Sequence, residues 1–242
     1  MDQSVLVAFD FDQTICDNNT DVVVQQLLPT SLISKEIQDL YKSSGWVIYM
    51  NKIFELLLDF VNYKQIEDAI INIPAVAGIE ELLTSLKASG HEIIIISDSN
   101  SVFVGHWLKN RKLDHVISHV FTNPAHFDIA GRLWVHPYHM QHACSLSAIN
   151  LCKGQILMDY IQERRKQGKN FKRIIYIGDG KNDLCPILRL SETDLACPRK
   201  NYALEDQLNK LSDSALMKAK IVFWHNGIDL RHSLEEIVKF SQ

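Results

Sequence analysis

The chain has 242 residues, 46% of them hydrophobic, which is enough to bury a sizeable core in one large domain or in a domain that carries an insertion. Its 25 basic and 29 acidic side chains give a net charge of -4 without any block of like charge, which argues against nucleic-acid and membrane-surface partners. No apolar stretch approaches the length of a membrane span.

The N-terminal segment and the cysteines lead us to expect a soluble cytoplasmic protein. The apolar run at residues 5–9 is short and is followed by acids, unlike the layout of a signal peptide. The cysteines are odd in number, scattered and without a CxxC pair, which suits a reducing compartment better than a disulfide framework. They are Cys16, Cys144, Cys152, Cys185 and Cys197.

Three apolar runs predict strands that are buried on both faces: VLVAF at 5–9, EIIIIS at 92–97 and RIIYIG at 173–178. Shorter runs at 195–197 and 220–224 could add two more strands. Between these runs, residues 79–90 and 155–168 show helical spacing of apolar residues, and each segment ends in glycine. The alternation predicts an α/β fold with a doubly wound parallel sheet.

Residues 17–75 break this alternation, because they have helical patterns and no convincing strand. We therefore predict an α/β catalytic core of residues 1–16 and 76–242 and a small inserted helical cap of residues 17–75, with Pro74 and Gly78 marking the return to the core. A second irregular insertion at about 123–150 contains a candidate hairpin around GRLWVHP (131–137).

Acidic side chains follow each of the three main strand candidates: Asp10 with Asp12, Asp98 after Ser97, and Asp179. The carboxyl ends of parallel strands meet at one edge of a sheet, so we expect these groups to converge. On an ideal strand, Asp10 and Asp12 would point to the same face, and such close carboxylates need a compensating cation. Oxygen-only ligands favour Mg²⁺, with Asp10 and Asp179 as natural ligands.

The motifs DFDQT (10–14), Ser97 at the end of IIIIS, Lys153 and GDGKND (178–183) resemble, in this order, the four motifs of the haloacid dehalogenase superfamily of phosphatases. Further stretches resemble its phosphoethanolamine/phosphocholine phosphatase and pyridoxal phosphate phosphatase family. These stretches are DNNTD (17–21), ISDSNSVF (96–103), VFTNPAHF (120–127), NLCK (150–153) and CPRKNY (197–202), the second and third leaning towards the pyridoxal phosphate branch. The resemblance implies a Rossmann-like core.

The resemblance also implies roles for the motif residues. Asp10 would be the nucleophile that forms an aspartyl phosphate, and Asp12 would protonate the leaving oxygen and then deprotonate water. Ser97 and Lys153 would hold the transferring phosphoryl group. A Mg²⁺ cofactor would be held by a carboxylate set in which Asp183 orients Asp179 or a bound water. That set is Asp10, Asp12, Asp179 and Asp183.

Asp21 and Asp98 match family positions that contact the head group of the substrate, where a carboxylate would suit an amine or a pyridinium. Residues 17–75 contain eight acidic residues against four lysines and no arginine, a poor environment for a second phosphate. We expect a small phosphorylated metabolite, with pyridoxal 5'-phosphate as the first candidate and phosphoethanolamine or phosphocholine as the alternative. Trp46 and its aromatic neighbours in the cap are predicted to be cap core rather than a stacking surface.

The segment 126–152 also suggests a zinc site, because it contains His126, His136, His139 and His142 together with Cys144 and Cys152. The spacing is irregular, and Ser147 stands near the place of a further cysteine in the family. Exposed histidines and buried cysteines are therefore the default interpretation. Lys181 occupies a position where the narrower family usually has a small residue, which could alter the charge at the mouth of the site.

Two other classes of function stay open. A phosphoaspartate signalling or binding module of the receiver type also combines acids, Ser/Thr and Lys on a parallel sheet. A receiver, however, places its phosphoacceptor on an interior strand and needs no helical cap. The third class is an inactive relative that serves as an interaction protein, although all four motif positions carry competent residues.

Overall fold

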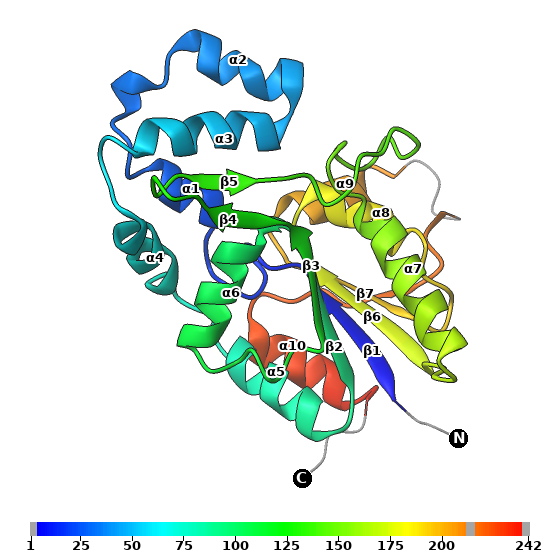
Figure 1. Ribbon diagram of the computed structural model, residues 1–242. Coiled ribbons are helices and arrows are strands. Elements are labelled where there is room, and N and C mark those ends of the chain that lie inside the picture. Colours follow the sequence, from blue (N-terminus) through cyan, green and yellow to red (C-terminus); the bar gives the residue numbers. More distant parts are fainter. Residues whose placement is uncertain (1–3, 212–215, 239–242) are drawn as a thin grey trace.

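Six parallel strands form the central sheet of the computed structural model, which describes residues 4–211 and 216–238 (Figure 1). The strand order is β3-β2-β1-β6-β7-β8, and every described pair in this sheet is parallel. The strands are β1 (Val5–Phe9), β2 (Glu92–Asn100), β3 (His119–Asn123), β6 (Arg173–Gly178), β7 (Leu195–Pro198) and β8 (Lys220–Ile221). The predicted doubly wound parallel fold is confirmed.

Both faces of this sheet are apolar because successive side chains of a strand point to opposite sides. In β1, Val5, Val7 and Phe9 join one core cluster, whereas Leu6 and Ala8 join another. Helices α5 (Ile79–Ala88), α6 (Ser101–Asn110) and α10 (Gly227–Glu235) cover the first face. Helices α7 (Lys153–Lys166), α8 (Leu184–Ile187) and α9 (Ala203–Asn209) cover the second face. The continuous apolar runs of the sequence reflect this two-sided burial.

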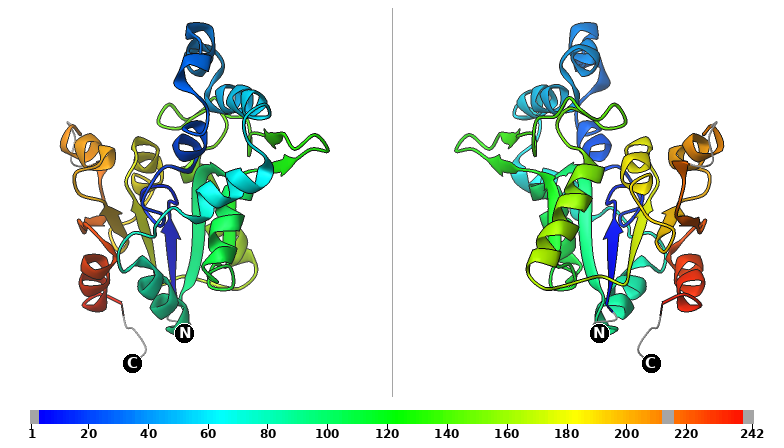
Figure 2. Two further views of the ribbon diagram at one scale, coloured as in Figure 1. Left: turned by 90° about the vertical axis from the view of Figure 1, so that its left-hand side faces the viewer. Right: turned by 90° about the vertical axis from the view of Figure 1, so that its right-hand side faces the viewer.

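Residues 17–74 contain helices and no strand, and Figure 2 shows that the helices of residues 20–57 stand over one end of the sheet. The helices of residues 17–74 are α1 (Thr20–Gln25), η1 (Thr30–Leu32), α2 (Lys35–Ser44), α3 (Trp46–Leu57) and α4 (Tyr63–Ile71). Three of them begin at local capping signals: the side chains of Asn19 before α1, Ser34 before α2 and Asn62 before α4 each accept a backbone N–H of the first turn.

The chain leaves and re-enters the sheet layer at two adjacent segments. Cys16 and Ala75 form an antiparallel bridge, and the N–H of Asp17 donates to the carbonyl of Pro74 at 2.8 Å. These contacts lie at the sequence boundary expected between core and cap. The division into residues 1–16 with 76–242 and residues 17–75 as separate domains stays a prediction.

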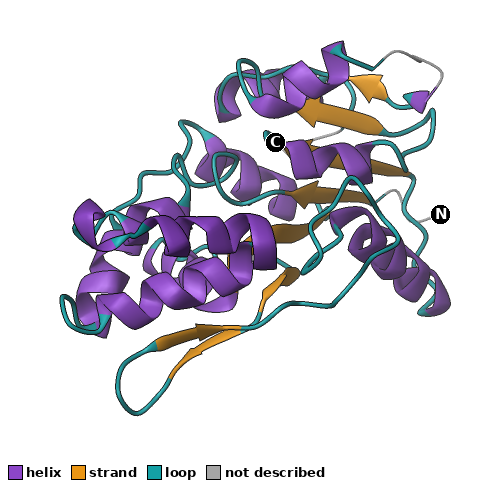
Figure 3. Cartoon of the chain, turned by 90° about the horizontal axis from the view of Figure 1, so that it is seen from above, coloured by secondary structure: helices purple, strands orange, loops and turns teal. Residues whose placement is uncertain are grey.

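A short antiparallel hairpin projects from the sheet layer, as Figure 3 shows. It consists of β4 (Ala125–Phe127) and β5 (Leu133–Val135), so the hairpin predicted around residues 131–137 is confirmed. Asn51 of α3 ties the hairpin to the helices above it: its Nδ2 donates to the carbonyl of Val135 at 2.7 Å, and its Oδ1 accepts the N–H of Val135 at 2.9 Å.

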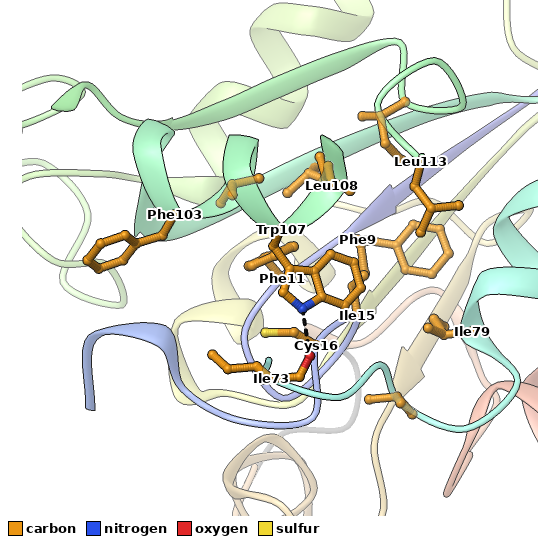
Figure 4. Packing of buried hydrophobic residues seen from close by; sticks show 14 of the residues in the cluster. Phe9, Phe11, Ile15, Cys16, Ile73, Ile79, Phe103, Trp107, Leu108 and Leu113 are labelled. Carbon is orange, nitrogen blue, oxygen red and sulfur yellow. Dashed lines mark hydrogen bonds between the residues drawn. The ribbon is translucent and has the colours of Figure 1, made fainter. Parts of the chain in front are cut away.

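Phe11 anchors the loop that follows β1 in the core beneath it (Figure 4). Its ring is fully buried and meets the ring of Trp107 edge to face, with centroids 5.4 Å apart. The indole N–H of Trp107 donates to the carbonyl of Ile73 at 3.0 Å, which links α6 to the segment returning from α4. The residues on either side of Phe11 are thereby held at the end of the sheet.

Two strand predictions need correction in length. Strand β2 continues past Ser97 to Asn100, and the strand expected at 220–224 is reduced to Lys220–Ile221.

Among the described residues, none of the helices combines the length and the hydropathy needed to cross a bilayer.

Candidate active site

Carboxylates from two loops meet at the carboxyl end of the sheet. Asp10 follows β1, while Asp179 and Asp183 follow β6. One oxygen from each of the three side chains lies within 4.8 Å of the others, and all three residues are buried. The convergence expected from the parallel strands is therefore present.

Lys153, the first residue of α7, lies between two of these carboxylates. Its Nζ is 2.6 Å from Asp10 Oδ2 and 2.8 Å from Asp183 Oδ1, and its side chain is only 1% exposed. Burial by itself lowers the pKa of Lys153, but the charges of Asp10 and Asp183 outweigh it and raise this pKa above its ordinary value. Lys153 is therefore a fixed buried cation.

Asp183 holds the loop after β6 in place. Its Oδ2 accepts the N–H groups of Asp179 at 3.1 Å and of Gly180 at 2.9 Å, and its Oδ1 accepts the hydroxyl of Tyr176 at 2.7 Å. A Cβ on Gly178 would lie 2.5 Å from Asp183 Oδ2, so only glycine allows this approach. Tyr176 was not predicted as a residue of this site. Its one signal in the sequence is a hydroxyl group within an otherwise apolar strand.

The three carboxylates are poorly compensated by the protein alone. Burial, followed by the charge of Asp183, raises the pKa of Asp10 well above its ordinary value and that of Asp179 to about 7, against the opposing effect of Lys153. Thr14 Oγ1 adds one hydrogen bond to Asp179 at 3.2 Å. Three clustered oxygen donors, of which Asp10 and Asp179 have raised pKa values, fit a hard divalent cation such as Mg²⁺.

The Asp12 carboxylate takes different partners and does not belong to this group. Its Oδ1 accepts the N–H of Thr20 and its Oδ2 accepts the Thr20 hydroxyl, both at 3.1 Å. The chain leaves strand geometry after Phe9, so the periodicity of an ideal strand does not extend to Asp12. Burial, followed by the charge of Asp21, raises the pKa of Asp12 to about 8. Coordination of metal by this side chain stays a prediction.

Strand β2 brings Ser97 and Asp98 to the same end of the sheet. Ser97 is fully buried, and its Oγ accepts the N–H of Ser99 at 3.1 Å. Asp98 Oδ2 accepts the side-chain amide of Asn182 at 2.8 Å, and the Asp98 carbonyl accepts that of Asn123 at 2.7 Å. Neither asparagine was predicted, because each is defined only by a partner distant in sequence.

Asp21 is buried in the first turn of α1 and bonds to an aromatic residue of α3. Trp46 Nε1 donates to Asp21 Oδ2 at 2.6 Å, and the Trp46 ring also packs against the rings of Tyr41 and Tyr49, with centroids 5.4 Å apart in both cases. Burial and the charge of Asp98 raise the pKa of Asp21 to about 7, despite the hydrogen bond from Trp46. A cationic group beside Asp21 would relieve this burial penalty.

The cysteines of the segment 126–152 have a third partner, Cys185, that the sequence analysis did not include. The sulfur atoms of Cys144, Cys152 and Cys185 form a close group in which none of the four histidines takes part. His139 lies next to it, with Nε2 accepting the N–H of Cys152 at 2.8 Å.

Lys181 is exposed at the start of η2 (Lys181–Asp183).

Comparison with known proteins gives consistent results over nearly the whole chain. A family model described as Putative Phosphatase matches residues 5–238. Pyridoxal phosphate phosphatase PHOSPHO2 of Mus musculus is 39% identical over 239 residues, which cover 97% of this chain and 99% of the relative. Phosphoethanolamine/phosphocholine phosphatase of Homo sapiens is 30% identical over 239 residues, which cover 97% and 89%.

The fold also has close neighbours among solved structures. A phospho-aspartyl intermediate analogue of phosphoserine phosphatase superposes with a TM-score of 0.64 at 21% identity, covering 98% of this chain and 100% of that chain. At this level of identity, the likeness concerns the arrangement of the sheet and its helices.

Proposed function

Because this chain belongs to the Putative Phosphatase family, we propose that it is a Mg²⁺-dependent phosphomonoesterase that works through an aspartyl phosphate on Asp10. The family expected from the motif order is confirmed, and the chain is a phosphatase with a haloacid dehalogenase-type fold. The observation that carries the proposal is the buried group of Asp10, Lys153, Asp179 and Asp183 at the carboxyl end of the sheet.

In the first step, an Asp10 carboxylate oxygen attacks phosphorus, the bond from phosphorus to the ester oxygen breaks, and Asp12 gives its proton to the departing alkoxide. The raised pKa of Asp12, about 8, keeps it protonated near neutral pH, as a general acid requires. In the second step, Asp12 takes a proton from a water molecule that attacks the phosphoenzyme. The bond to Asp10 breaks, and inorganic phosphate leaves.

Lys153 and Ser97 would bind the phosphoryl oxygens. The ammonium group of Lys153 is held by Asp10 and Asp183, so it is positioned before substrate binds and needs little reorganisation. The Ser97 Oγ accepts the N–H of Ser99, which leaves the hydroxyl proton of Ser97 to be donated. Thr20 fixes Asp12 through both carboxylate oxygens.

Asp10, Asp179 and Asp183 offer the oxygen donors that would hold Mg²⁺, with Asp12 as an additional candidate ligand. When bound, the ion supplies positive charge that offsets the phosphoryl oxygens and the carboxylates. The raised pKa values of Asp10 and Asp179 support this assignment, because they indicate that the carboxylates lack sufficient counter-charge from the protein.

For the substrate, we propose pyridoxal 5'-phosphate, with phosphoethanolamine or phosphocholine as the alternative. The named activities of the relatives at 39% and 30% identity support these candidates in that order. Asp21 and Asp98 would face the amine or pyridinium of the head group, and Trp46, bonded to Asp21, offers a ring beside it. We also propose a cytoplasmic location, which the five free thiols support.

The test is release of inorganic phosphate in Mg²⁺ from pyridoxal 5'-phosphate, phosphoethanolamine, phosphocholine, a sugar phosphate and pyrophosphate, with Asp10→Asn as the control. Preference for pyridoxal 5'-phosphate that the control abolishes is the expected result. Phosphate release that persists in Asp10→Asn would contradict the mechanism, and preference for an amine phosphate would select the alternative substrate.

A phosphoaspartate signalling module is not favoured. Strand β1 is first in the chain but interior in the sheet, between β2 and β6, so an interior strand does not separate this fold from a receiver as the sequence analysis assumed. The helices of residues 17–74 and the phosphatase family do separate the two. Repeated turnover in the phosphate assay distinguishes them directly.

A further inference from the structure

Three thiols from different parts of the chain meet in a second cluster, in which Cys152 and Cys185 are close in sequence to Lys153 and Asp183. Cys144 belongs to the loop between β5 and α7, Cys152 is the residue before α7, and Cys185 lies in α8. Cys144 Sγ is 3.4 Å from Cys185 Sγ, and Cys152 Sγ is 3.7 Å from it. All three sulfur atoms lie within 4.8 Å of one another.

These separations match the edges of a metal-centred tetrahedron. A disulfide requires about 2.05 Å between sulfurs, far shorter than either distance. With Zn–S bonds of about 2.3 Å, two thiolates of a tetrahedral site lie about 3.8 Å apart, close to what is found here. The cysteines thus have the spacing of ligands that share one small ion.

A fourth donor lies close to two of the three sulfur atoms. Ser147 Oγ is 3.5 Å from Cys144 Sγ and 3.3 Å from Cys152 Sγ. An oxygen and a sulfur bound to the same tetrahedral zinc would lie about 3.5 Å apart. We propose that Cys144, Cys152 and Cys185 bind one zinc ion, with the Ser147 hydroxyl as the fourth ligand.

The loop that supplies two of the four ligands is already ordered around a single side chain. Gln141 Oε1 accepts the N–H of Cys144 at 2.8 Å. Gln141 Nε2 donates to the carbonyls of Cys144 at 3.2 Å, Ser147 at 3.3 Å and Ala148 at 2.8 Å. Cys144 and Ser147 are therefore positioned before metal binds, which lowers the entropic cost of binding.

Close packing fixes the other two ligands. Cys152 and Cys185 are buried, and the N–H of Cys152 donates to His139 Nε2. A Cβ on Gly154 would lie 2.6 Å from Cys185 Sγ, so the first turn of α7 approaches this thiol as closely as it does only because residue 154 is glycine. The Arg189 guanidinium, 4.0 Å from Cys152 Sγ, would offset part of the thiolate charge.

The donor chemistry selects a soft metal over the Mg²⁺ of the acidic group. Thiolates prefer zinc and related soft ions, whereas Mg²⁺ prefers oxygen.

The zinc would fasten two segments that carry active-site groups. Cys152 directly precedes Lys153, and Cys185 lies in the same short stretch as Asp183, whose side chain bonds to Lys153 at 2.8 Å. Joining Cys152 to Cys185 through a metal would restrain the relative position of that pair. The cysteines are thus positioning residues, and the site exists whether or not the proposed hydrolytic mechanism is correct.

The experiment measures zinc bound to the purified full chain in buffer with excess Mg²⁺ and no chelator. Elemental analysis after dialysis against zinc should give one equivalent per chain, and Co²⁺ in place of zinc should give the absorption of a tetrahedral thiolate site. Cys144→Ser should lower zinc affinity by about a hundredfold. Cys197→Ala, which removes a buried thiol outside the cluster, should retain the bound equivalent.

Ser147→Cys provides a gain-of-affinity test that removes no thiol, so it remains informative if Cys144→Ser fails to fold. It should tighten zinc binding and strengthen the thiolate-to-cobalt absorption. The proposal is overturned if Cys144→Ser binds as much zinc as the parent chain, or if zinc leaves the reactivity of the Cys144 thiol, which is the only one of the five that is not buried, unchanged. A Cys144–Cys185 disulfide found by mass spectrometry in the isolated protein would also overturn it.

Discussion

The Lys153 ammonium lies 2.6 Å from the Asp10 carboxylate, both almost completely buried, although one residue follows the first strand and the other begins α7. This ion pair links the proposed nucleophile, Asp10, to the cation that would hold the phosphoryl group, Lys153. It also balances charge where three carboxylates gather. Substitution of Asp10 or Lys153 should therefore change both the activity and the stability of the protein.

Replacement of Asp10 by Asn removes the proposed nucleophile and should lower kcat by at least about a thousandfold. The variant should remain folded, because loss of one buried negative charge relieves repulsion from Asp179 and Asp183. Steady-state phosphate release and a thermal melt check the two statements. The exposed Asp114→Asn serves as the matched control with normal turnover, and near-normal turnover in Asp10→Asn would refute the mechanism.

Lys153→Met keeps the approximate volume but removes the cation between Asp10 and Asp183. Breaking a buried pair from one side should lower the free energy of unfolding by about 3–5 kcal/mol, because two carboxylates lose their counter-charge. Chemical denaturation without Mg²⁺ measures the loss. Lys166→Met on the same helix, at a side chain that is 66% exposed, should change stability by less than about 0.5 kcal/mol. Equal effects of the two substitutions would refute a structural role for the buried pair.

Mg²⁺ should raise the melting temperature of the parent chain, because it neutralises carboxylates whose pKa values are raised by burial and mutual repulsion. At a Mg²⁺ concentration of 100 times Kd, the expected stabilisation is about 2.7 kcal/mol. Asp179→Asn should raise the Mg²⁺ concentration for half-maximal activity by about tenfold or more. A Mg²⁺ titration of activity and melting temperature provides both readouts, and an unchanged midpoint in Asp179→Asn would exclude it as a ligand.

Asp21→Asn should distinguish charged from uncharged head groups. We expect kcat/KM for pyridoxal 5'-phosphate or phosphoethanolamine to fall by about tenfold, equivalent to about 1.4 kcal/mol, because the substitution removes the buried carboxylate that we propose faces the cation. Phenyl phosphate, which has no positive charge, should be affected by less than about twofold. An equal loss for all three substrates would show that Asp21 acts through the structure of α1 and not through the head group.

Glu92 lies at the start of β2, at the opposite end of the sheet from the acidic group. It should make the free energy of unfolding depend on pH in the acid range. Burial acts to raise its pKa, but hydrogen bonds from Arg164, Lys169 and Tyr160 outweigh it and lower the pKa to about 2. A lowered pKa in the folded state means that this stabilisation is complete above the ordinary glutamate pKa and is lost as the pH falls towards 2.

Glu92→Gln should therefore lower the free energy of unfolding by about 2–3 kcal/mol at neutral pH, and the difference from the parent chain should shrink between about pH 4.5 and 2. Urea denaturation across this range measures it. Glu163→Gln, at a side chain that is 56% exposed, is the control and should show no such window. A difference between parent and Glu92→Gln that is independent of pH would contradict the assignment.

The fold class, the parallel strands and the acids that follow them were predictable from the amino-acid sequence. These features depend on local periodicity: a strand buried on both faces must be continuously apolar, and polar residues follow where the strand approaches the end of the sheet. The order of the motifs that contain Asp10, Ser97, Lys153 and Asp179 then indicated the family of the chain, and the comparison with known proteins confirms that family.

The partners of these residues, by contrast, depend on how the chain packs in three dimensions. Lys153 could be assigned to phosphate from the sequence, but its pairing with Asp183, the bond from Trp46 to Asp21 and the addition of Cys185 to the thiol group depend on how distant segments pack. Such contacts leave no periodic signal, because each is set by the distance between two elements that the chain connects through long intervening segments. Burial then makes those partners energetically important, because a buried charge or thiol must find compensation inside the protein.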